Sequence, residues 1–135
     1  MNCIALLADF AQVADGKLYI MGGGWSTAKF DGPVQMALAL RVSVPWDRAD
    51  EVYQLRVDLR MQDGEQFTVD GKPLEVQAQF QVGRAPGVPK GTDLDAFFAF
   101  NIGGFLMSAG AYYWQVHVDE APVARAPFVV RRSAS

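Results

Sequence analysis

Val52-Tyr-Gln-Leu-Arg-Val-Asp-Leu-Arg-Met-Gln62 alternates apolar and polar residues without a break. The apolar positions run from Tyr53 to Met61 at every second residue, and polar residues from Gln54 to Gln62 stand between them. Successive side chains of a strand point to opposite faces, so this pattern predicts a half-buried β-strand. Residues 74–82 and 112–119 repeat the alternation and predict two more strands.

Three other stretches, residues 4–13, 36–44 and 96–102, are apolar at odd and even positions alike. Such strands are either covered on both sides or meet a partner on their outer face. Residues 18–21 and 128–130 predict shorter strands, with Pro127 suited to an edge or a bulge because it lacks a backbone N–H.

Turn signals separate these strands. Asp15-Gly16, Asp63-Gly64 and Asp70-Gly71 are tight-turn dipeptides, and residues 119–120 fall where another turn is needed. Residues 83–92, rich in glycine and proline, predict a loop, and residues 47–51 have room for one helical turn. About eight or nine short strands with turns between them predict an all-β chain, an antiparallel β-sandwich that forms a single domain over residues 1–135.

Composition narrows the function classes. The chain of 135 residues is 50% hydrophobic and 20% charged, which excludes intrinsic disorder. Its formal charge of −3 argues against general nucleic-acid binding. One histidine and one cysteine make a His/Cys metal site improbable, and Cys3 alone cannot form an intrachain disulfide. No run reaches the length of a membrane helix, and the first residues lack the basic leader of a signal peptide, so we expect a cytoplasmic protein with no membrane association.

The run from Leu106 to Asp119 resembles the last hairpin of an immunoglobulin-like or fibronectin-like sandwich. In those domains a leucine and a glycine precede a tyrosine whose hydroxyl bonds back to the preceding loop. The matching residues are Gly110 and Tyr112, with Trp114 following on the same face. The cysteine pair of antibody domains is absent, so the resemblance implies only the general immunoglobulin-like sandwich.

Nearly the whole chain is similar to a family of small bacterial and bacteriophage proteins classed as a domain of unknown function. The similarity lies in short motifs spread along the sequence: Leu7-Ala8-Asp9, Ala11-Gln12-Val13, Gly16-Lys17-Leu18-Tyr19-Ile20, Gly22-Gly23-Gly24-Trp25, Val44-Pro45, Phe80-Gln81-Val82-Gly83-Arg84, Asn101-Ile102 and Gly110-Ala111-Tyr112. The resemblance implies a compact stand-alone sandwich, encoded by phages in some cases, and it supplies no catalytic residues.

Few residues suggest chemistry. The run Gly22-Gly23-Gly24 could suggest a phosphate loop, but no helix pattern follows it. We expect a bend that needs positive φ, or bare backbone against which Trp25 packs. His117 is expected to be an ordinary exposed strand histidine, and Cys3 a small buried apolar residue. Loop carboxylates offer a calcium site without a recognisable spacing: Asp47, Asp50, Glu51, Asp93 and Asp95.

Two surfaces are candidate interfaces. The first is a flat face with few acids, which forms if two of the strands are neighbours. Its residues are Arg56, Arg60, Gln77, Gln79 and Gln81. It is either a solvated surface or a docking face for protein or carbohydrate. The second is Phe97, which must point away from the side that holds Phe98 and Phe100, and is exposed unless that side is covered.

These observations predict a non-enzymatic protein that works by protein–protein interaction, as a homo-oligomer or a subunit of a larger assembly, without a cofactor or metal. A bacteriophage virion or accessory protein is the first alternative. A carbohydrate- or calcium-binding module that uses the loop carboxylates with Trp25, Trp46 and Trp114 is the second, and an enzyme is the third.

Overall fold

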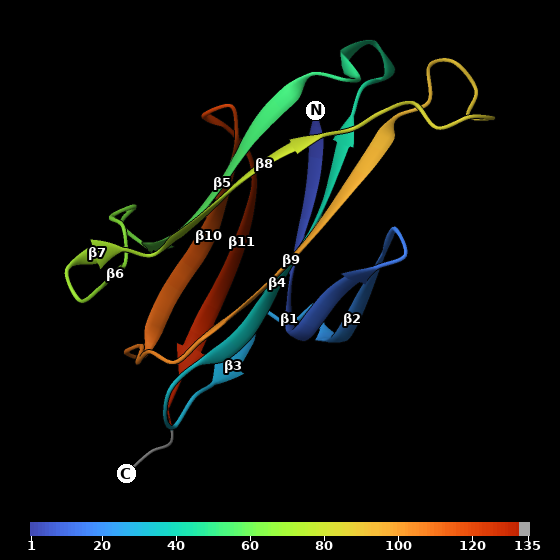
Figure 1. Ribbon diagram of the computed structural model, residues 1–135. Coiled ribbons are helices and arrows are strands. Elements are labelled where there is room, and N and C mark those ends of the chain that lie inside the picture. Colours follow the sequence, from blue (N-terminus) through green and yellow to red (C-terminus); the bar gives the residue numbers. More distant parts are fainter. Residues whose placement is uncertain (133–135) are drawn as a thin grey trace.

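Residues 1–132 are described by the computed structural model, and they form an all-β fold with eleven strands and one short 3-10 helix, Trp46–Arg48. A four-stranded antiparallel sheet has the spatial order β2 (Lys17–Gly23), β1 (Asn2–Ala14), β4 (Gln35–Val44) and β9 (Leu94–Gly103). Figure 1 shows how the strands are arranged.

A five-stranded sheet has the order β3 (Thr27–Lys29), β11 (Ala121–Arg131), β10 (Gly110–Val118), β5 (Val52–Met61) and β8 (Glu75–Gln81). Its strands pair antiparallel except for β3, which runs parallel to β11. The strands β6 (Thr68–Val69) and β7 (Lys72–Pro73) form a small hairpin of their own beside β5. The long strands expected from alternation are therefore present.

The structure has more strands than the eight or nine expected. The additional ones, β3, β6 and β7, are only two or three residues long. A period of two cannot be recognised in so short a segment, and β3 is held by pairing with the distant β11 rather than by its own pattern. Pro127 lies in β11 outside the stretch that pairs with β3, where its missing N–H costs no ladder bond on that side.

The two larger sheets share one hydrophobic core. Apolar side chains from β1, β4 and β9 meet those from β5, β10 and β11, and Trp114 is fully buried among them. Tyr112 stacks on Phe128 at 5.8 Å between ring centroids and donates its hydroxyl to the Ser108 carbonyl oxygen at 2.8 Å. This is the bond to the preceding loop that the sequence predicts for Tyr112, and it fixes the start of β10.

Positive φ angles mark the predicted tight turns. Asp15 and Gly16 between β1 and β2 have φ of 52° and 69°, and Asp119 and Glu120 between β10 and β11 have 50° and 67°. Two successive residues with positive φ match the right-handed twist of the strands that they join. Residues 83–92 form a loop, as expected.

Candidate functional site

The largest concentration of exposed apolar side chains lies on β1 and β2. Of the ten large hydrophobic residues that are exposed in residues 1–132, seven belong to these two strands. We call these seven residues together the apolar face: Ile4, Leu6, Phe10, Val13, Tyr19, Ile20 and Met21. Within the β1–β2 hairpin, Phe10, Tyr19 and Met21 lie on one side, and Val13 and Ile20 lie on the other. Contiguous exposed patches of large apolar side chains often mark an interaction site.

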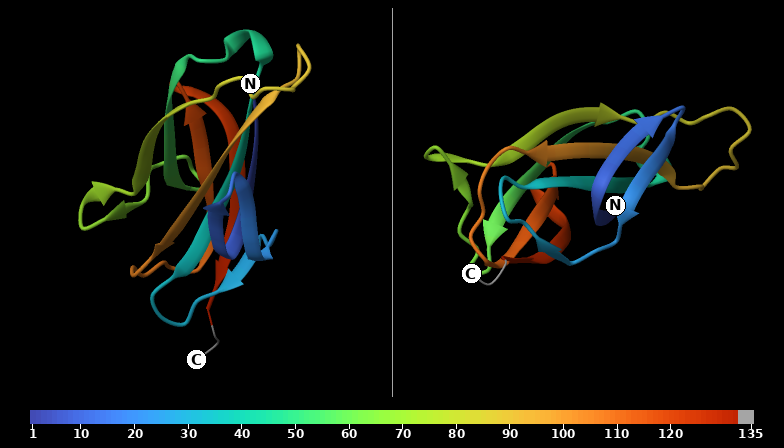
Figure 2. Two further views of the ribbon diagram at one scale, coloured as in Figure 1. Left: turned by 45° about the vertical axis from the view of Figure 1, so that its right-hand side comes forward. Right: turned by 90° about the horizontal axis from the view of Figure 1, so that it is seen from below.

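A change of direction in β1 brings this face together. Residues 2–8 of β1 pair with β4, whereas the second half of the strand pairs only with β2. The β1–β2 hairpin then packs across the outer side of the four-stranded sheet, in contact with β9 as well as β4, and projects from the body of the molecule (Figure 2). The strand β1 therefore contributes both to the sheet and to a flap on its outer side.

Small residues allow the hairpin to approach so closely. The contact is an alanine cluster with Leu18 at its margin, and four of its alanines are buried: Ala8, Ala11, Ala37 and Ala39. Asn101 on β9 completes the contact, since its Nδ2 donates to the Ala11 carbonyl oxygen at 2.8 Å and its Oδ1 accepts from the Ala11 amide at 3.2 Å. This side chain takes the place of a neighbouring strand where β4 no longer pairs with β1.

Phe97 lies in the same layer but is not exposed as expected. It stands opposite Arg41 on β4, which in turn stands opposite Ile4 on β1, so the three side chains share one row. Phe97 is half-buried, and in the same row the Arg41 side chain donates to Asp95 Oδ2 at 3.1 Å. Phe97 therefore lies at the margin of the apolar face and not at its centre.

The outer face of the five-stranded sheet differs from the expected flat face with few acids. The strands β5 and β8 are neighbours, with Arg56 opposite Gln77, and the glutamines Gln77, Gln79 and Gln81 are exposed. The face is not poor in acids, however. Arg56 also binds Glu120, its Nη2 donating to Oε2 at 2.9 Å, and lies 3.9 Å from Glu75.

Asp58 is the centre of this charged cluster and is completely buried. Arg56 donates to its Oδ2, and Arg60 Nε donates to its Oδ1 at 2.7 Å. Burial opposes ionisation of Asp58, but the hydrogen bond and charge of Arg60, with the charges of His117 and Arg56, bring its pKa below the ordinary value. Arg56 and Arg60 are therefore held in ion pairs, which leaves them less free to bind a partner than the sequence suggested.

His117 is buried, contrary to the expectation of an exposed histidine. It points outward as strand parity predicts, but only 7% of it is accessible because the long side chains around Asp58 cover it. Its Nε2 lies 3.3 Å from Asp58 Oδ2, and neither ring nitrogen has a hydrogen bond of good geometry within residues 1–132. The alternation correctly predicts the face on which His117 lies, but it does not predict that neighbouring side chains cover that face.

The glycine run forms a bend. Gly22 and Gly24 have φ of 60° and 89°, and a Cβ on Gly22 would overlap the Asp9 carboxylate. The chain continues into β3 without a helix, and the Trp25 ring packs edge-on against Phe128 at 6.3 Å. The expectation of a bend with positive φ is confirmed. Gly110 also has a positive φ, 152°, at the first position of β10.

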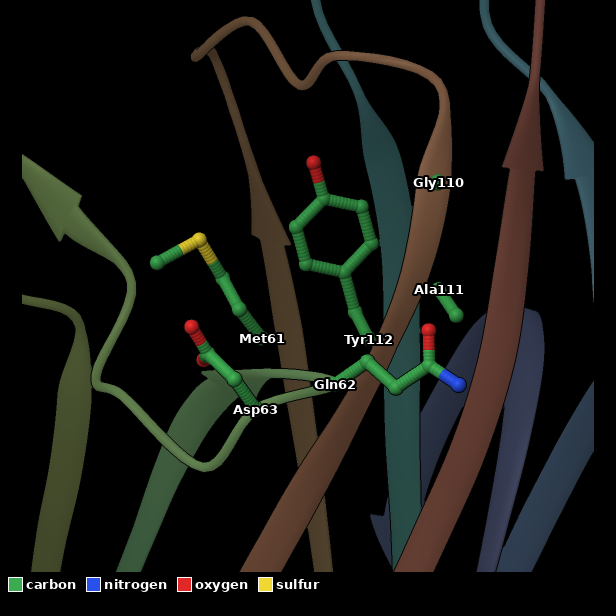
Figure 3. A pocket seen from close by; sticks show the side chains of 6 residues that line it. All are labelled: Met61, Gln62, Asp63, Gly110, Ala111 and Tyr112. Carbon is green, nitrogen blue, oxygen red and sulfur yellow. The ribbon is translucent and has the colours of Figure 1, made fainter.

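An open hollow of about 460 Å³ lies where β5 ends beside β10. Figure 3 shows Met61 and Tyr112 extending in the same direction there, with Asp63 next to Met61. A second hollow of about 380 Å³ shares Gln62 and Tyr112 with it and reaches Tyr113, over whose ring the Arg125 guanidinium lies at 4.2 Å. These hollows offer an amide, a guanidinium and aromatic rings.

In the described part of the chain, no three His, Cys, Asp or Glu side chains are grouped so that they could hold a metal ion. Residues 1–132 also include no helix long and apolar enough to cross a membrane. Trp114, one of the tryptophans considered for sugar binding, is wholly inside the core and cannot stack on a ligand.

Comparison with known proteins identifies a protein family that matches nearly the whole chain. The model of DUF6941, a family of unknown function, matches residues 3–131. No curated protein matches the chain. Among solved structures, a Pseudomonas fluorescens alkylpurine DNA glycosylase bound to DNA with an abasic site analog is 12% identical, with a TM-score of 0.39 over 78% of this chain and 28% of that chain. The chain spans less than a third of the length of that enzyme chain.

Proposed function

The chain belongs to the DUF6941 family, whose function is unknown, and we propose that it acts by protein–protein interaction, without catalysis, as a homo-oligomer or as a subunit of a larger assembly. The observation that carries the proposal is the apolar face, seven large side chains between 36% and 67% exposed on two adjoining strands. Water solvates such a surface poorly, so its burial against another protein is favourable.

The size of the face supports the same proposal. A stable interface of standard size buries about 800 Å² on each partner, and seven exposed apolar side chains on two adjoining strands can supply a large part of such an area. Its centre on the hairpin is free of charged side chains, as the core of an interface usually is. The charged cluster around Asp58 lies on the other sheet and is satisfied within the chain.

We also propose an immunoglobulin-like sandwich as the finer description of the fold. The hydroxyl bond of Tyr112 and the core shared by the two sheets support it. The parallel pairing of β3 with β11 and the folded-back β1–β2 hairpin are additions to that plan. A bacterial or phage-encoded protein, with a virion or accessory role as the alternative, is suggested by the sequence resemblance alone, and a cytoplasmic location by the single thiol.

A carbohydrate-binding module remains a second candidate because of one observation. The hollow lined by Gln62 and Arg125 offers an amide and a guanidinium that can hydrogen-bond to a sugar, with the Tyr113 ring beneath Arg125. A glycan that binds only the folded state would raise the melting temperature. If no glycan in a panel shifts it at millimolar concentration, this candidate fails.

The test of the leading proposal is solution mass by light scattering after gel filtration, over a hundredfold range of concentration. We expect a discrete multimer in the wild type. Met21→Asp, at a site 67% exposed on the apolar face, should raise the dissociation constant by about tenfold or more, since it buries a charge. Leu106→Asp is the matched control, because Leu106 is 65% exposed but lies in the loop after β9. A monomer at every concentration, or equal effects of both changes, would overturn the proposal.

A further inference from the structure

We propose that two copies of the chain join by antiparallel pairing of β2 with β2 of the second copy, centred on Ile20, so that the two four-stranded sheets become one continuous sheet. The inference rests on the proposed self-association and adds the segment, the direction and the register of the contact. The contact would lie along β2, which is the edge strand at the hairpin end of the four-stranded sheet.

The strand β2 is an edge strand without the usual protection. Natural edge strands avoid pairing with other chains by being short or by carrying charges, prolines or bulges. The other edges follow this rule: β3 has three residues, β9 carries Asp95, and β8 carries Glu75. The strand β2 likewise has one charged residue, but Lys17 stands at its first position, and the uncharged run Leu18-Tyr19-Ile20-Met21 follows it. This run is open to a further strand along its free side.

The backbone of Ile20 points toward that open side. Ala11 directs both its N–H and its C=O to the Asn101 side chain, away from β2. Ala11 and Ile20 are opposite one another in the antiparallel β1–β2 pair. In such pairs, a residue that turns both groups away faces a partner that does the same. The N–H and C=O of Ile20 are therefore directed to the free edge, where the same two groups of a second Ile20 can exchange two hydrogen bonds with them.

A two-fold axis at Ile20 gives a favourable register. It places Tyr19 opposite Met21 of the second copy and Met21 opposite Tyr19, pairs in which a thioether meets an aromatic ring. The two lysines do not meet, because Lys17 falls toward the Gly22-Gly23 end of the second strand, where the φ of 60° at Gly22 ends the regular extended backbone. The strand is thus complementary to itself, as a two-fold interface requires.

The same register gathers the exposed apolar side chains. Phe10 stands opposite Met21 within each chain, so the two copies of Phe10, Tyr19 and Met21 would form one cluster on a single face of the joined sheet. Ile20 lies on the other face beside its own copy. These are residues that are 36–67% exposed in the single chain. The pairing therefore accounts for the most exposed part of the apolar face.

Disulfide trapping tests the register. One chain carries Tyr19→Cys and another Met21→Cys, and each is oxidised alone and as an equimolar mixture. In the proposed register residues 19 and 21 form a non-hydrogen-bonded pair with Cα atoms about 4.5 Å apart, which a disulfide can span, whereas like positions lie about 7–8 Å apart on the diagonal. The wild type is the control, because burial raises the pKa of the Cys3 thiol to about 11 and keeps it protonated.

We expect about tenfold more covalent dimer from the mixture than from either chain alone. Ile20→Pro should also weaken association, since it removes the N–H aimed at the free edge, while circular dichroism confirms that the chain stays folded. If the wild type forms a multimer but the mixture gives no excess of covalent dimer, the inference is wrong and the proposed self-association stands. If the wild type is a monomer at every concentration, both are wrong.

Discussion

The side chain of Asn101 binds both backbone groups of Ala11, which lies 90 residues earlier in the chain. No strand of the sheet reaches Ala11 on that side, so the amide of Asn101 satisfies a donor and an acceptor that packing would otherwise leave without partners. The β1–β2 hairpin, and with it the apolar face, is held on the sheet by this pair together with the alanine cluster.

Asn101→Ala should therefore loosen the hairpin more than the rest of the fold. Two lost hydrogen bonds, each worth about 0.5–1.5 kcal/mol, predict a loss of about 1–3 kcal/mol in the free energy of unfolding. Amide hydrogen exchange should accelerate in residues 10–21 and stay unchanged in β10. An equal acceleration in both regions would show that Asn101 supports the whole fold and not the hairpin.

Asn101→Asp separates the two bonds. An aspartate keeps the acceptor for the Ala11 N–H, but it places a carboxylate oxygen against the Ala11 carbonyl oxygen, where Asn101 Nδ2 now donates. We expect this variant to protect the hairpin no better than Asn101→Ala. Full protection in the aspartate variant would mean that the Nδ2 bond contributes nothing.

Sequence alternation identified the strands because the period of two is a local property of β5, β8 and β10. It could not identify the fold-back of β1. The apolar residues of β1 at odd and even positions did indicate that both of its sides are covered or in contact with a partner, and both outcomes occur: Ala8 and Ala11 lie under cover while Ile4 and Leu6 remain exposed. The small size of the alanines permits close packing, but the sequence near them does not identify what covers Ala11, since Asn101 lies 90 positions away.

The charged cluster shows a second limit of reading from sequence. Strand parity correctly predicts that Arg56, Asp58 and His117 lie on the outer face, but it does not predict which of these side chains are exposed there. Long side chains on neighbouring strands can cover a short one, and Asp58 is completely buried by such cover. Whether an outward residue is exposed depends on the register between β5 and β10, which the sequence does not state.

Asp58→Asn should destabilise the fold strongly. The substitution leaves Arg56 and Arg60 without the carboxylate that neutralises them, and it removes the carboxylate beside His117. Breaking a buried ion pair costs about 3–5 kcal/mol, and because both arginines are partly exposed we expect about 2–4 kcal/mol, measured by urea unfolding. Glu120→Gln is the control, since Glu120 is largely exposed, and it should leave the unfolding midpoint nearly unchanged.

The same carboxylate should give a defined pH dependence. Burial alone would raise the pKa of Asp58, but the hydrogen bond and charge of Arg60, with the charges of His117 and Arg56, outweigh it and make this pKa lower in the folded chain than in the unfolded one. Ionised Asp58 therefore stabilises the fold fully above about pH 4, and this contribution is lost as the pH falls through its folded pKa. The difference in unfolding free energy between the wild type and Asp58→Asn should be constant from pH 7 to 5 and shrink below pH 4. A difference that stays constant down to pH 2.5 would contradict this assignment.

Tyr112→Phe tests how much the start of β10 depends on one hydroxyl. The Tyr112 O–H donates to the Ser108 carbonyl oxygen at 2.8 Å, and its ring is buried against Phe128 and Phe67. Phenylalanine keeps the ring contacts and removes only the hydrogen bond, so the free energy of unfolding should fall by about 1 kcal/mol. Tyr19→Phe is a matched control, because Tyr19 is half exposed on the hairpin, and it should change unfolding by less than about 0.5 kcal/mol. Equal losses in the two variants would show that the bond to Ser108 adds nothing beyond removal of a tyrosine hydroxyl.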